Sequence, residues 1–417
     1  AAPARSRWLA RSWTARADSS RAGGAVQRPA GRARLARHGT RSSEPRVRIA
    51  LDARKIRDGG IGTYVRQLLL ALAAAPGPHE WVALLDPRDL GAFAWPGARV
   101  REVAVRAGKY GLAEHLAVPR AARAAGVGLL HEPHYTLPLG WRGPAVVTIH
   151  DLIHLSHARF FRPGAALYAR AMAGAAVRRA RLVLADSAFT RAEIVERLGA
   201  DPARVRVVPL GVPAGMARRD PGAIAAFRAA RALPAEYVLY VGARKPHKNL
   251  PLLLEALARL APAGRPPLVL SGAPWAAGHP LARLAARLGL AGAVHFAGDL
   301  DDEALACLYS GAALYAHPAL TEGFGLPPLE AMACGTPVLC SDGGALPETV
   351  GEAAALLAPR DPAAWAHEVG ALLADGQRRA ALARAGLARA REFTWERTAA
   401  ATLAVYAEAA GAGRGPG

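Results

Sequence analysis

The stretch from residue 46 to residue 75, RVRIALDARKIRDGGIGTYVRQLLLALAAA, decides the fold of this chain. Its first part, 46–53, is a short run rich in Val, Ile and Leu, which is typical of a buried strand. A glycine-bearing loop follows, and from residue 62 onward the apolar side chains recur at the spacing of a helix. A buried strand followed by a helix is the first half of a βαβ unit and predicts a parallel sheet.

The alternation of short apolar strands with helices continues in two series. The first series ends near residue 212, and the second opens with EYVLYVGA at 236–243. Residues 211–235 are rich in Gly and Pro, so we expect this segment to contain a linker. Two such series predict an α/β fold with two Rossmann-like domains, each a doubly wound parallel sheet, that face each other across a cleft.

The two series also suggest domain bounds. We expect an N-terminal Rossmann-like domain at 46–212 and a C-terminal one at 213–392. Residues 393–417 are expected to form a helix that packs back on the N-terminal domain, followed by a tail. In sheets of this kind ligands bind at the carboxyl ends of the strands, so motifs at strand ends are the first candidates for function.

The net charge of +20 is concentrated at the start of the chain. Residues 1–48 hold twelve arginines against Asp18 and Glu44, a net charge of +10. The segment lacks sustained apolar periodicity, so residues 1–45 are predicted to be a disordered, Arg-rich extension. The whole chain has 49 arginines and four lysines, which indicates GC-rich codon usage rather than targeting. We therefore expect no nucleic-acid partner.

The composition of the remainder is that of a globular protein. Of the 417 residues, 52% are hydrophobic and 21% are charged. The cysteines at 307, 334 and 340 lack C-x-x-C spacing, which favours a reduced cytosolic compartment with neither a disulfide framework nor a zinc site. Because the sequence has no apolar stretch of membrane-spanning length, we expect a cytoplasmic protein. Peripheral contact with the inner face of the membrane stays open.

Residues 321–338, TEGFGLPPLEAMACGTPV, place Glu322 and Glu330 on either side of two glycines and two prolines. The prolines suit the first turn of a helix that would carry Glu330. Gly323 and Gly325 let the preceding backbone approach a ligand and present its N–H groups to phosphate or sugar oxygens. Glu322 would then accept from sugar hydroxyls and Glu330 from a vicinal diol. Compensation of the helix dipole alone would explain Glu330 but not the glycines.

A cationic cluster follows another predicted strand. The stretch YVGARKPHKNL at 240–250 gathers Arg244, Lys245, His247 and Lys248 between a strand end and the start of a helix. A solvated basic loop is the simplest interpretation of such a charge run. A strand end, a helix N-terminus and several cations also form a natural site for a pyrophosphate.

Two further candidates lie in the N-terminal half. His150 ends the strand pattern in VVTIHDLIHL, where residues of a binding site sit in this type of sheet. In DGGIGTYV at 58–65, Gly60 and Gly62 have the G-x-G spacing of a dinucleotide fingerprint, but the third glycine is replaced by Val65. The glycines either form an ordinary turn or expose N–H groups at a helix N-terminus to an anion or a reacting sugar.

The pair Asp299 and Asp301 has the D-x-D spacing by which some glycosyltransferases hold a divalent metal. Both acids immediately precede a predicted helix, EALACLYS. Capping of that helix and compensation of its dipole explain them without a metal. We therefore expect no metal site and no cofactor.

Taken together, these motifs resemble the retaining glycosyltransferases of family four, which have the GT-B fold. EGFGLPPLE is similar to the E-x7-E signature of that family, and the resemblance extends over about residues 46–405. It is also carried by these stretches: LDARKIRDGGIGTYVRQLL, HEPHYTLPL, TIHDLIHL, ADSAFTRAEIVERLG, VVPLGV, YVGARKPHKNL, GDLDDEALACLYSGAALYAHPALTEGFGLPPLEAMACGTPVLCSDGGALPE and FTWERTAAATLAVY. Among family members, the chain looks most like bacterial mannosyltransferases that act on cell-surface polysaccharides.

The resemblance implies roles for individual residues. Lys248 matches a lysine on the pyrophosphate, and Arg244 is an offset candidate for its usual arginine companion. Glu322 would contact the transferred sugar, and His150 matches a histidine beside it. The donor-binding set implied in the same way is Gly323, Phe324, Gly325, Leu326, Glu330, Gly60 and Gly62. Members of this fold are metal-independent, which agrees with the capping interpretation of the aspartates.

The resemblance implies a retaining transfer of a hexose, mannose being favoured, from a nucleotide-diphosphate sugar to a glycan or lipid-linked acceptor. GDP-mannose is the favoured donor, and possible contact with an anionic membrane would bring the enzyme to its acceptor. The alternatives are a nucleotide-sugar epimerase or phosphorylase of the same fold, or a basic nucleic-acid or membrane binder. A phosphorylase would need a pyridoxal lysine among only four lysines.

Overall fold

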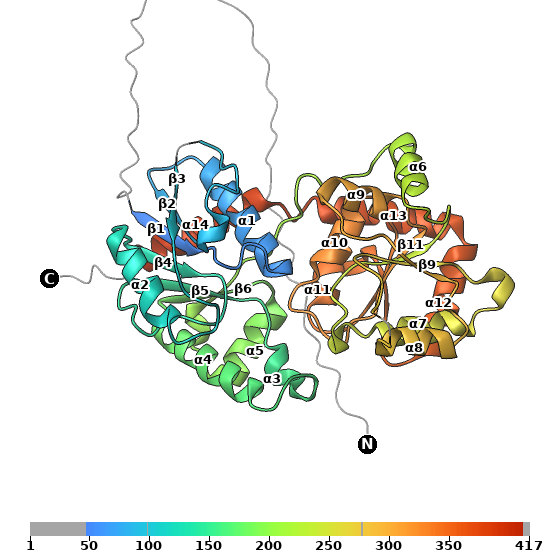
Figure 1. Cartoon of the computed structure of the whole chain (residues 1–417), viewed down its shortest axis with the longest axis horizontal. Helices are drawn as coiled ribbons and strands as arrows, with labels where there is room; N and C mark the ends of the chain where they lie inside the picture. The colour runs from blue at the N-terminus through green and yellow to red at the C-terminus, as the bar shows by residue number, and fades with distance from the viewer. Residues whose placement is uncertain (1–46, 98, 277, 412–417) are drawn as a thin grey trace, which may run out of the picture. The chain divides into compact units, whose positions relative to one another are not determined.

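The computed structural model describes residues 47–97, 99–276 and 278–411, all within one compact unit. The predicted Arg-rich extension at 1–45 lies outside these residues. The described chain contains two parallel sheets, each with helices around it (Figure 1), as the alternating sequence pattern predicted.

The first sheet has seven strands in the order β3-β2-β1-β4-β5-β6-β7, and every pair is parallel. Its strands are β1 (Arg48–Asp52), β2 (Glu80–Leu85), β3 (Val100–Ala104), β4 (Leu129–Glu132), β5 (Ala145–Ile149), β6 (Leu182–Ala185) and β7 (Val205–Val207). The helices of this half are α1 (Gly59–Ala74), α2 (Glu114–Ala124), α3 (Ile153–Ser156), α4 (Ala165–Arg179) and α5 (Ala188–Leu198). The strand order reverses between β1 and β4, and the carboxyl ends at such a switch point form the ligand crevice in doubly wound sheets.

The second sheet repeats this topology in the order β10-β9-β8-β11-β12-β13, again with parallel pairs. Its strands are β8 (Val238–Tyr240), β9 (Leu268–Leu270), β10 (Val294–Phe296), β11 (Leu314–His317), β12 (Val338–Ser341) and β13 (Ala355–Leu357). The helices are α6 (Pro221–Ala230), α7 (Leu250–Arg259), α8 (Pro280–Arg287), α9 (Asp302–Ser310), α10 (Leu326–Ala333), α11 (Leu346–Val350), α12 (Pro362–Ala374) and α13 (Gly376–Ala390). Its switch point lies between β8 and β11, where two of the predicted motifs end their strands.

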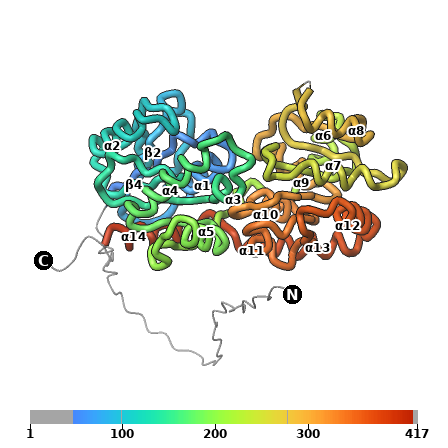
Figure 2. The backbone as a smooth tube through the Cα atoms, turned by 90° about the horizontal axis from the view of Figure 1, so that it is seen from below, coloured from blue at the N-terminus to red at the C-terminus, as the bar shows by residue number. Residues whose placement is uncertain are grey.

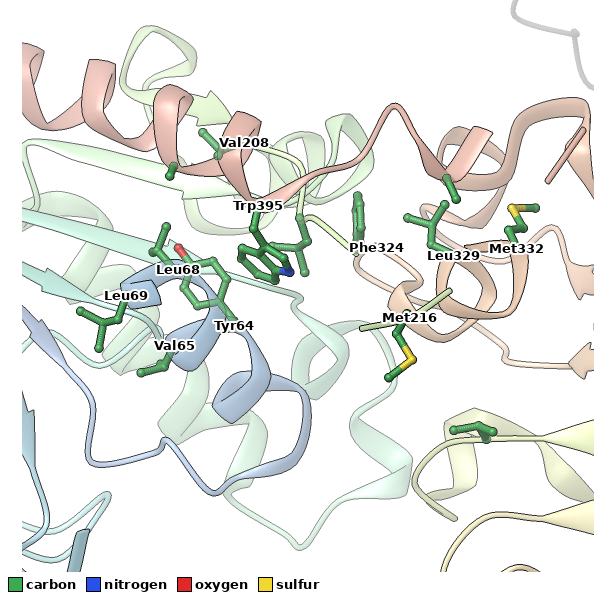
Figure 3. Close-up of a cluster of buried hydrophobic side chains, with 14 of the residues drawn as sticks. Tyr64, Val65, Leu68, Leu69, Val208, Met216, Phe324, Leu329, Met332 and Trp395 are labelled. Atoms are coloured by element: carbon green, nitrogen blue, oxygen red, sulfur yellow. The ribbon is translucent and has the colours of Figure 1, made fainter. Parts of the chain in front are cut away.

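The last helix, α14 (Trp395–Gly411), packs against elements of the first sheet. In Figures 1 and 2 it lies beside α1 and β4. The hydroxyl of Tyr406 pairs with Nδ1 of His131 at 2.6 Å, and both side chains are buried. Figure 3 shows the indole of Trp395 against Tyr64 of α1, with the ring centroids 6.1 Å apart. Buried aromatic contacts therefore fix this helix on the N-terminal half.

The segment at 211–235, where a linker was expected, contains the short helix α6, because Pro221 begins the helix and the Asp220 side chain accepts from the backbone N–H of Ala223. One local expectation needs correction. The first helix was expected from residue 62, but α1 begins at Gly59, so Gly60 lies in its first turn rather than in a loop before it.

Candidate functional site

The centre of the candidate site is a buried ion pair between Lys248 and Glu322. Nζ of Lys248 lies 2.5 Å from Oε1 of Glu322, and the two side chains are 16% and 9% exposed. Nε2 of His317, the last residue of β11, approaches the same Oε1 at 2.7 Å. Burial alone would raise the pKa of Glu322, but the charge of Lys248 and the hydrogen bonds hold it well below its ordinary value. Glu322 is therefore a carboxylate with one oxygen engaged.

The second oxygen of Glu322, Oε2, makes no hydrogen bond within the part of the chain that the structure describes, since both bonds end on Oε1. Burial lowers the pKa of His317, so its ring is neutral. A neutral ring that donates from Nε2 to the carboxylate must accept at Nδ1, where the Tyr315 hydroxyl lies at 2.9 Å. The carboxylate is thus held in one orientation with Oε2 available to a ligand hydroxyl.

The loop that carries Lys248 is fixed to the loop that carries Glu322. The side chain of Asn249 donates from Nδ2 to the carbonyls of Pro318 and Pro359 at 3.1 and 3.0 Å. Its backbone has a φ of 57°, which asparagine tolerates better than most residues. The carbonyl of His247 accepts from the N–H of Leu320 at 2.8 Å. These bonds hold the ion pair in place because β8 and β11 are neighbours in the sheet.

The glycines that precede α10 are required by close packing. A Cβ at position 323 would lie 1.9 Å from the carbonyl oxygen of His150. Gly325 has a φ of +110°, and a Cβ there would approach Leu346 to 2.7 Å. No larger residue fits either position without a shift of the surrounding chain. The two glycines of the signature therefore allow close backbone packing. They bring the loop of residues 321–325, which we call the sugar loop, against His150.

The hydrogen-bond donors at the start of α10 are the backbone N–H groups of residues 323–326. The N–H groups of Gly323 through Leu326 donate to no acceptor among the described residues. Pro327 and Pro328 have no N–H to offer, so the helix terminus adds little beyond these amides. The side chain of Phe324 is buried against Phe393, so only its backbone is available. These amides are therefore free to donate to a ligand, and their predicted role in binding one stays a prediction.

Glu330 lies buried in α10. Its Oε2 accepts from the hydroxyl of Tyr309 at 2.9 Å, and Oε1 has no partner in the described part of the chain. Burial raises the pKa of Glu330 to about 7, although the hydrogen bond from Tyr309 opposes the shift. Both glutamates of the signature therefore have one oxygen held by the protein and one left free.

The ring of His150 is bound on both of its nitrogens. Nδ1 lies 2.7 Å from Oδ2 of Asp186, and Nε2 lies 3.1 Å from the carbonyl of Pro133. Burial would lower the pKa of His150, but the charge and hydrogen bond of Asp186 raise it above its ordinary value. Both partners can accept a hydrogen bond, so they fix the orientation of the ring, and any charge on it is paired with Asp186. The group that touches the sugar loop is its backbone carbonyl.

A clamp of three residues joins α5 to this loop. Oγ of Ser187 and Oγ1 of Thr190 donate to the carbonyl of Gly323 at 2.7 and 3.0 Å. The carboxylate of Glu348 accepts from the N–H groups of Ala188 and Phe189 at 2.8 and 3.2 Å, where the helix dipole favours a negative charge. The first turn of α5 thus positions the backbone at Gly323, directly after Glu322.

Arg244 lies in a different environment from Lys248. Its Nη2 donates to the carbonyl of Ser271 at 2.9 Å, and its guanidinium lies over the ring of Phe296. Burial lowers its pKa, and the nearby Tyr240 opposes that effect only in part. The side chain of Arg244 is bound at the ends of β9 and β10. Its role beside Lys248 on the diphosphate is therefore a proposal.

Gly62 has a structural task that excludes part of its predicted role. A Cβ at this position would lie 2.4 Å from the carbonyl oxygen of Ile56, whereas one at Gly60 would meet nothing within 4 Å. The N–H of Gly62 donates to the carbonyl of Asp58 at 3.1 Å. Because the helix begins at Gly59, this N–H is already satisfied and is not free for an anion.

Asp301 caps α9, as the sequence predicted. Its Oδ1 accepts from the N–H of Ala304 at 2.8 Å, and Asp302 and Glu303 follow in the first turn. Among the residues that the structure describes, no group of three or more His, Cys, Asp and Glu side chains has a geometry suited to a metal ion.

Sequence reasoning missed three partners of the site: His317, Asp186 and Tyr309. His317 and Asp186 each stand at or just after the end of a strand, in the same place as the predicted His150. That position was a usable signal. Tyr309 carries no such signal, because it lies in the last turn of α9 and only the packing of α9 on α10 brings it to Glu330.

Two family models match the chain. One, described as Glycosyl transferases group 1, matches residues 225–389, and the other, described as Glycosyltransferase Family 4, matches residues 58–215. These matches fall on the two sheets described above. The fold and the site together define a glycosyltransferase with the two-sheet GT-B architecture.

Curated relatives agree with this class. O-antigen chain mannosyltransferase B of Escherichia coli is 33% identical over 282 residues, which cover 67% of this chain and 74% of the relative. A D-inositol 3-phosphate glycosyltransferase of Kineococcus radiotolerans is 35% identical over 358 residues, with 75% and 81% covered. The chain belongs to family four of the glycosyltransferases.

Solved structures show the same fold. Sucrose-phosphate synthase from Thermosynechococcus elongatus superposes with a TM-score of 0.72 at 25% identity, covering 87% of this chain and 98% of that one. HepE from Anabaena, solved in complex with UDP-glucose, has a TM-score of 0.68 at 21% identity, with 86% and 100% covered. The latter likeness supports the architecture alone.

Proposed function

We propose that this glycosyltransferase moves a hexose, with retention of configuration, from a nucleotide-diphosphate sugar to a glycan or lipid-linked acceptor. One observation carries the proposal: Glu322 and Glu330 each keep one carboxylate oxygen free, and unpaired backbone amides lie between them in sequence. A sugar nucleotide offers hydroxyls, a diphosphate and a ribose diol in that order. We assign the sugar hydroxyls to Glu322, the diphosphate to the amides and Lys248, and the ribose diol to Glu330.

The charges around Glu322 suit departure of a nucleoside diphosphate. As the bond to the sugar breaks, negative charge develops on the phosphate and the sugar becomes oxocarbenium-like. Lys248 and the free amides of residues 323–326 would stabilise the phosphate charge without a metal. The low pKa of Glu322 makes it a weak nucleophile, so its proposed task is to bind the sugar and stabilise positive charge.

The favoured donor is GDP-mannose, because the chain resembles the mannosyltransferase-type members and is 33% identical to an O-antigen mannosyltransferase. A thermal-shift screen with GDP-, UDP- and ADP-sugars tests this choice, since a ligand that binds the native state raises the melting temperature by mass action. Stabilisation by GDP-mannose above the other donors is expected. A product whose anomeric configuration is inverted relative to the donor, seen by NMR, would contradict retention.

The raised pKa of Glu330 gives a prediction for pH dependence. Its folded pKa is about 7, above the ordinary 4.5, so its favourable contribution to stability is complete below about 4.5 and is lost as pH rises through about 7. The shift corresponds to about 3 kcal/mol. Chemical denaturation of wild type and Glu330→Gln between about pH 5 and about pH 8 should show this loss in the wild type only.

The same group should govern nucleotide affinity. Ribose hydroxyls donate more strongly to a carboxylate than to a carboxylic acid, so binding favours the ionised form. Affinity for GDP, measured by calorimetry, is therefore expected to increase as pH rises through about 7 and to lose this step in Glu330→Gln. An unchanged pH profile in the variant would show that Glu330 does not contact the nucleotide.

We also propose peripheral contact with an anionic membrane, which would bring the enzyme to a lipid-linked acceptor. Leu112, just before α2, and Leu116, in its first turn, are 88% and 68% exposed. Leu139 is also exposed, and its N–H donates to Nδ1 of His115 in the same turn. Arg120 follows on the same helix and is exposed. Three other arginines of the basic N-terminal half, at 123, 179 and 181, donate to backbone carbonyls and are structural.

The leucine pair provides the test of this contact. The Leu112→Ser/Leu116→Ser variant should lose about tenfold or more of its affinity for vesicles of phosphatidylglycerol and phosphatidylcholine, because each buried leucine contributes about 1.5–3 kcal/mol. Vesicle flotation measures this loss. Leu167→Ser, which changes an exposed leucine on α4, is the control and should bind like the wild type. Equal binding by both variants would contradict the assignment.

No helix within the described residues has both the length and the apolar character needed to cross a membrane.

A further inference from the structure

A second group of buried charges lies at the switch point of the first sheet. We call it the Lys55 cluster, and it consists of Asp52, Arg54, Lys55, Glu114, Glu132 and His134. Asp52 ends β1 and Glu132 ends β4, which are neighbours in the sheet. All six side chains are buried, and none of them has a task in the mechanism above.

Three of the six side chains form an ion-pair network. The guanidinium of Arg54 donates to Asp52 from Nε at 2.9 Å and from Nη2 at 2.6 Å. The same Nη2 reaches Oε2 of Glu114 at 3.2 Å. This network explains the burial of these three residues as structure.

The cluster also has unmade hydrogen bonds, one of them on Glu114 of that network. Nζ of Lys55, Oε1 of Glu114, Oε1 of Glu132 and Nδ1 of His134 are buried with no partner among the described residues. An unsatisfied buried polar atom costs about 1–3 kcal/mol, and native proteins keep few of them. Four such atoms in one place indicate polar groups that await a ligand.

Tyr110 covers Nζ of Lys55 and contacts two other residues of the cluster, since its N–H donates to Oε2 of Glu114 at 3.0 Å. Its ring lies over Nζ of Lys55, 4.0 Å from the ring centroid, and its hydroxyl lies 3.3 Å from Nε2 of His134. The residue has a φ of +60°, which is uncommon for tyrosine, and it is 45% exposed. Lys109 ties the segment to Asp58 at 2.5 Å through a partly exposed pair. A strained, exposed ring over an unpaired cation has the properties of a movable cover.

The cluster lies next to the reaction site. Glu132 and His134 flank Pro133, whose carbonyl accepts from Nε2 of His150. Asp58, which holds the cover through Lys109, is the residue before α1. The cluster therefore adjoins His150, whose own carbonyl contacts the sugar loop.

The chemistry of the cluster selects the type of ligand. Asp52 and Glu114 balance the charges of Arg54 and Lys55 even when Glu132 is protonated, so the cluster offers an anion no net positive charge. Burial lowers the pKa of Lys55 to about 8 and raises that of Glu132, which weakens both charges. A donor beside an acceptor suits a neutral hydroxyl, which can accept from Lys55 and donate to Glu132. The ring of Tyr135 lies 3.8 Å from that of His134, centroid to centroid, and adds an apolar face.

We propose that the Lys55 cluster binds hydroxyl groups of a neutral acceptor sugar and that movement of Tyr110 opens it. The proposal rests on the glycosyltransferase function above and adds the chemical class of the acceptor moiety. It excludes an acceptor that places a phosphate at this position, whereas a neutral sugar ring fits.

Acetylation of the four lysines, followed by mass spectrometry of the full-length protein, tests the proposal. The probes are methyl α-mannoside, methyl α-glucoside, methyl α-galactoside and mannose 6-phosphate. At least one neutral glycoside should slow acetylation of Lys55 several-fold, and mannose 6-phosphate should not. Lys245, which is exposed, is the internal control and should react at the same rate throughout. Tyr110→Gly should speed acetylation of Lys55 by roughly tenfold or more, because it removes the cover.

Three results would overturn the proposal: no protection of Lys55 by any neutral glycoside, equal or greater protection by mannose 6-phosphate, or no acceleration in Tyr110→Gly. The same spectra report on the donor site, because GDP should protect Lys248. If GDP does not protect Lys248, the proposed donor site is wrong. The Lys55 result does not depend on that outcome, because a different lysine reports it.

Discussion

The Lys248→Ala variant is expected to turn over its donor sugar roughly 10²- to 10³-fold more slowly than the wild-type protein. Lys248 is the cation that the site holds closest to Glu322, and it would stabilise the charge that develops on the departing diphosphate. A preorganised donor of this kind acts mainly on the transition state, so kcat should fall more than KM rises. Release of nucleoside diphosphate at saturating donor measures the effect.

Removal of Lys248 also leaves Glu322 as a buried carboxylate without its cation, which destabilises proteins by about 3–5 kcal/mol. The melting temperature of the variant is therefore measured first, and rates are compared below it. The double variant Lys248→Ala/Glu322→Gln removes the unpaired charge and should recover stability without recovering turnover. Lys245→Ala, in the same loop but exposed, is the control and should keep wild-type rates. Near-normal turnover by Lys248→Ala would refute the assigned role.

Gly323→Ala is expected to reduce turnover by about 100-fold, because the new methyl group would overlap the carbonyl oxygen of His150 at 1.9 Å. The backbone has to move, and a displacement of about 1 Å at a reacting centre can have an effect of this size. The movement would also disturb the bonds from Ser187 and Thr190 to the Gly323 carbonyl. Steady-state kinetics with the donor identified by thermal shift gives the measurement.

A matched control separates this effect from a general loss of helix or loop stability. Gly376→Ala changes a glycine whose added Cβ would meet nothing within 4 Å, and its stability should change by less than about 0.5 kcal/mol. Calorimetric binding of GDP shows whether Gly323→Ala keeps its nucleotide site. A Gly323→Ala protein with wild-type turnover would mean that contact between the sugar loop and His150 is not needed for the reaction.

The sequence predicted the main residues of the proposed site but not all of their contacts. Glu322, Glu330 and the glycines between them were predicted because they are close in sequence and share one strand-loop-helix motif. Lys248 was predicted because it follows a strand in a cationic run. Arg244 comes from the same run, yet the structure directs it to Ser271 and Phe296, since its side chain is drawn to a carbonyl and a ring that local sequence does not reveal.

Other contacts needed the folded chain. The ring of His150 was expected beside a ligand, but Asp186 and Pro133 hold both of its nitrogens. Gly62 was grouped with ligand-binding residues, although its absent side chain makes room for the Ile56 carbonyl. Spacing predicts that a glycine permits a close approach, but it does not say whether the approaching group is a ligand or the protein's own backbone.

The sequence by itself determined two parallel αβ sheets and the capping of α9 by Asp301, because periodicity and caps depend on residues within a few positions of one another. Only the tertiary structure decided which charges meet. Lys248 and Glu322 are 74 residues apart and lie 2.5 Å apart because β8 and β11 are paired in the sheet. The strength of that pair, and the pKa of Glu322, depend on distance and burial, and both of these arise when the sheet assembles.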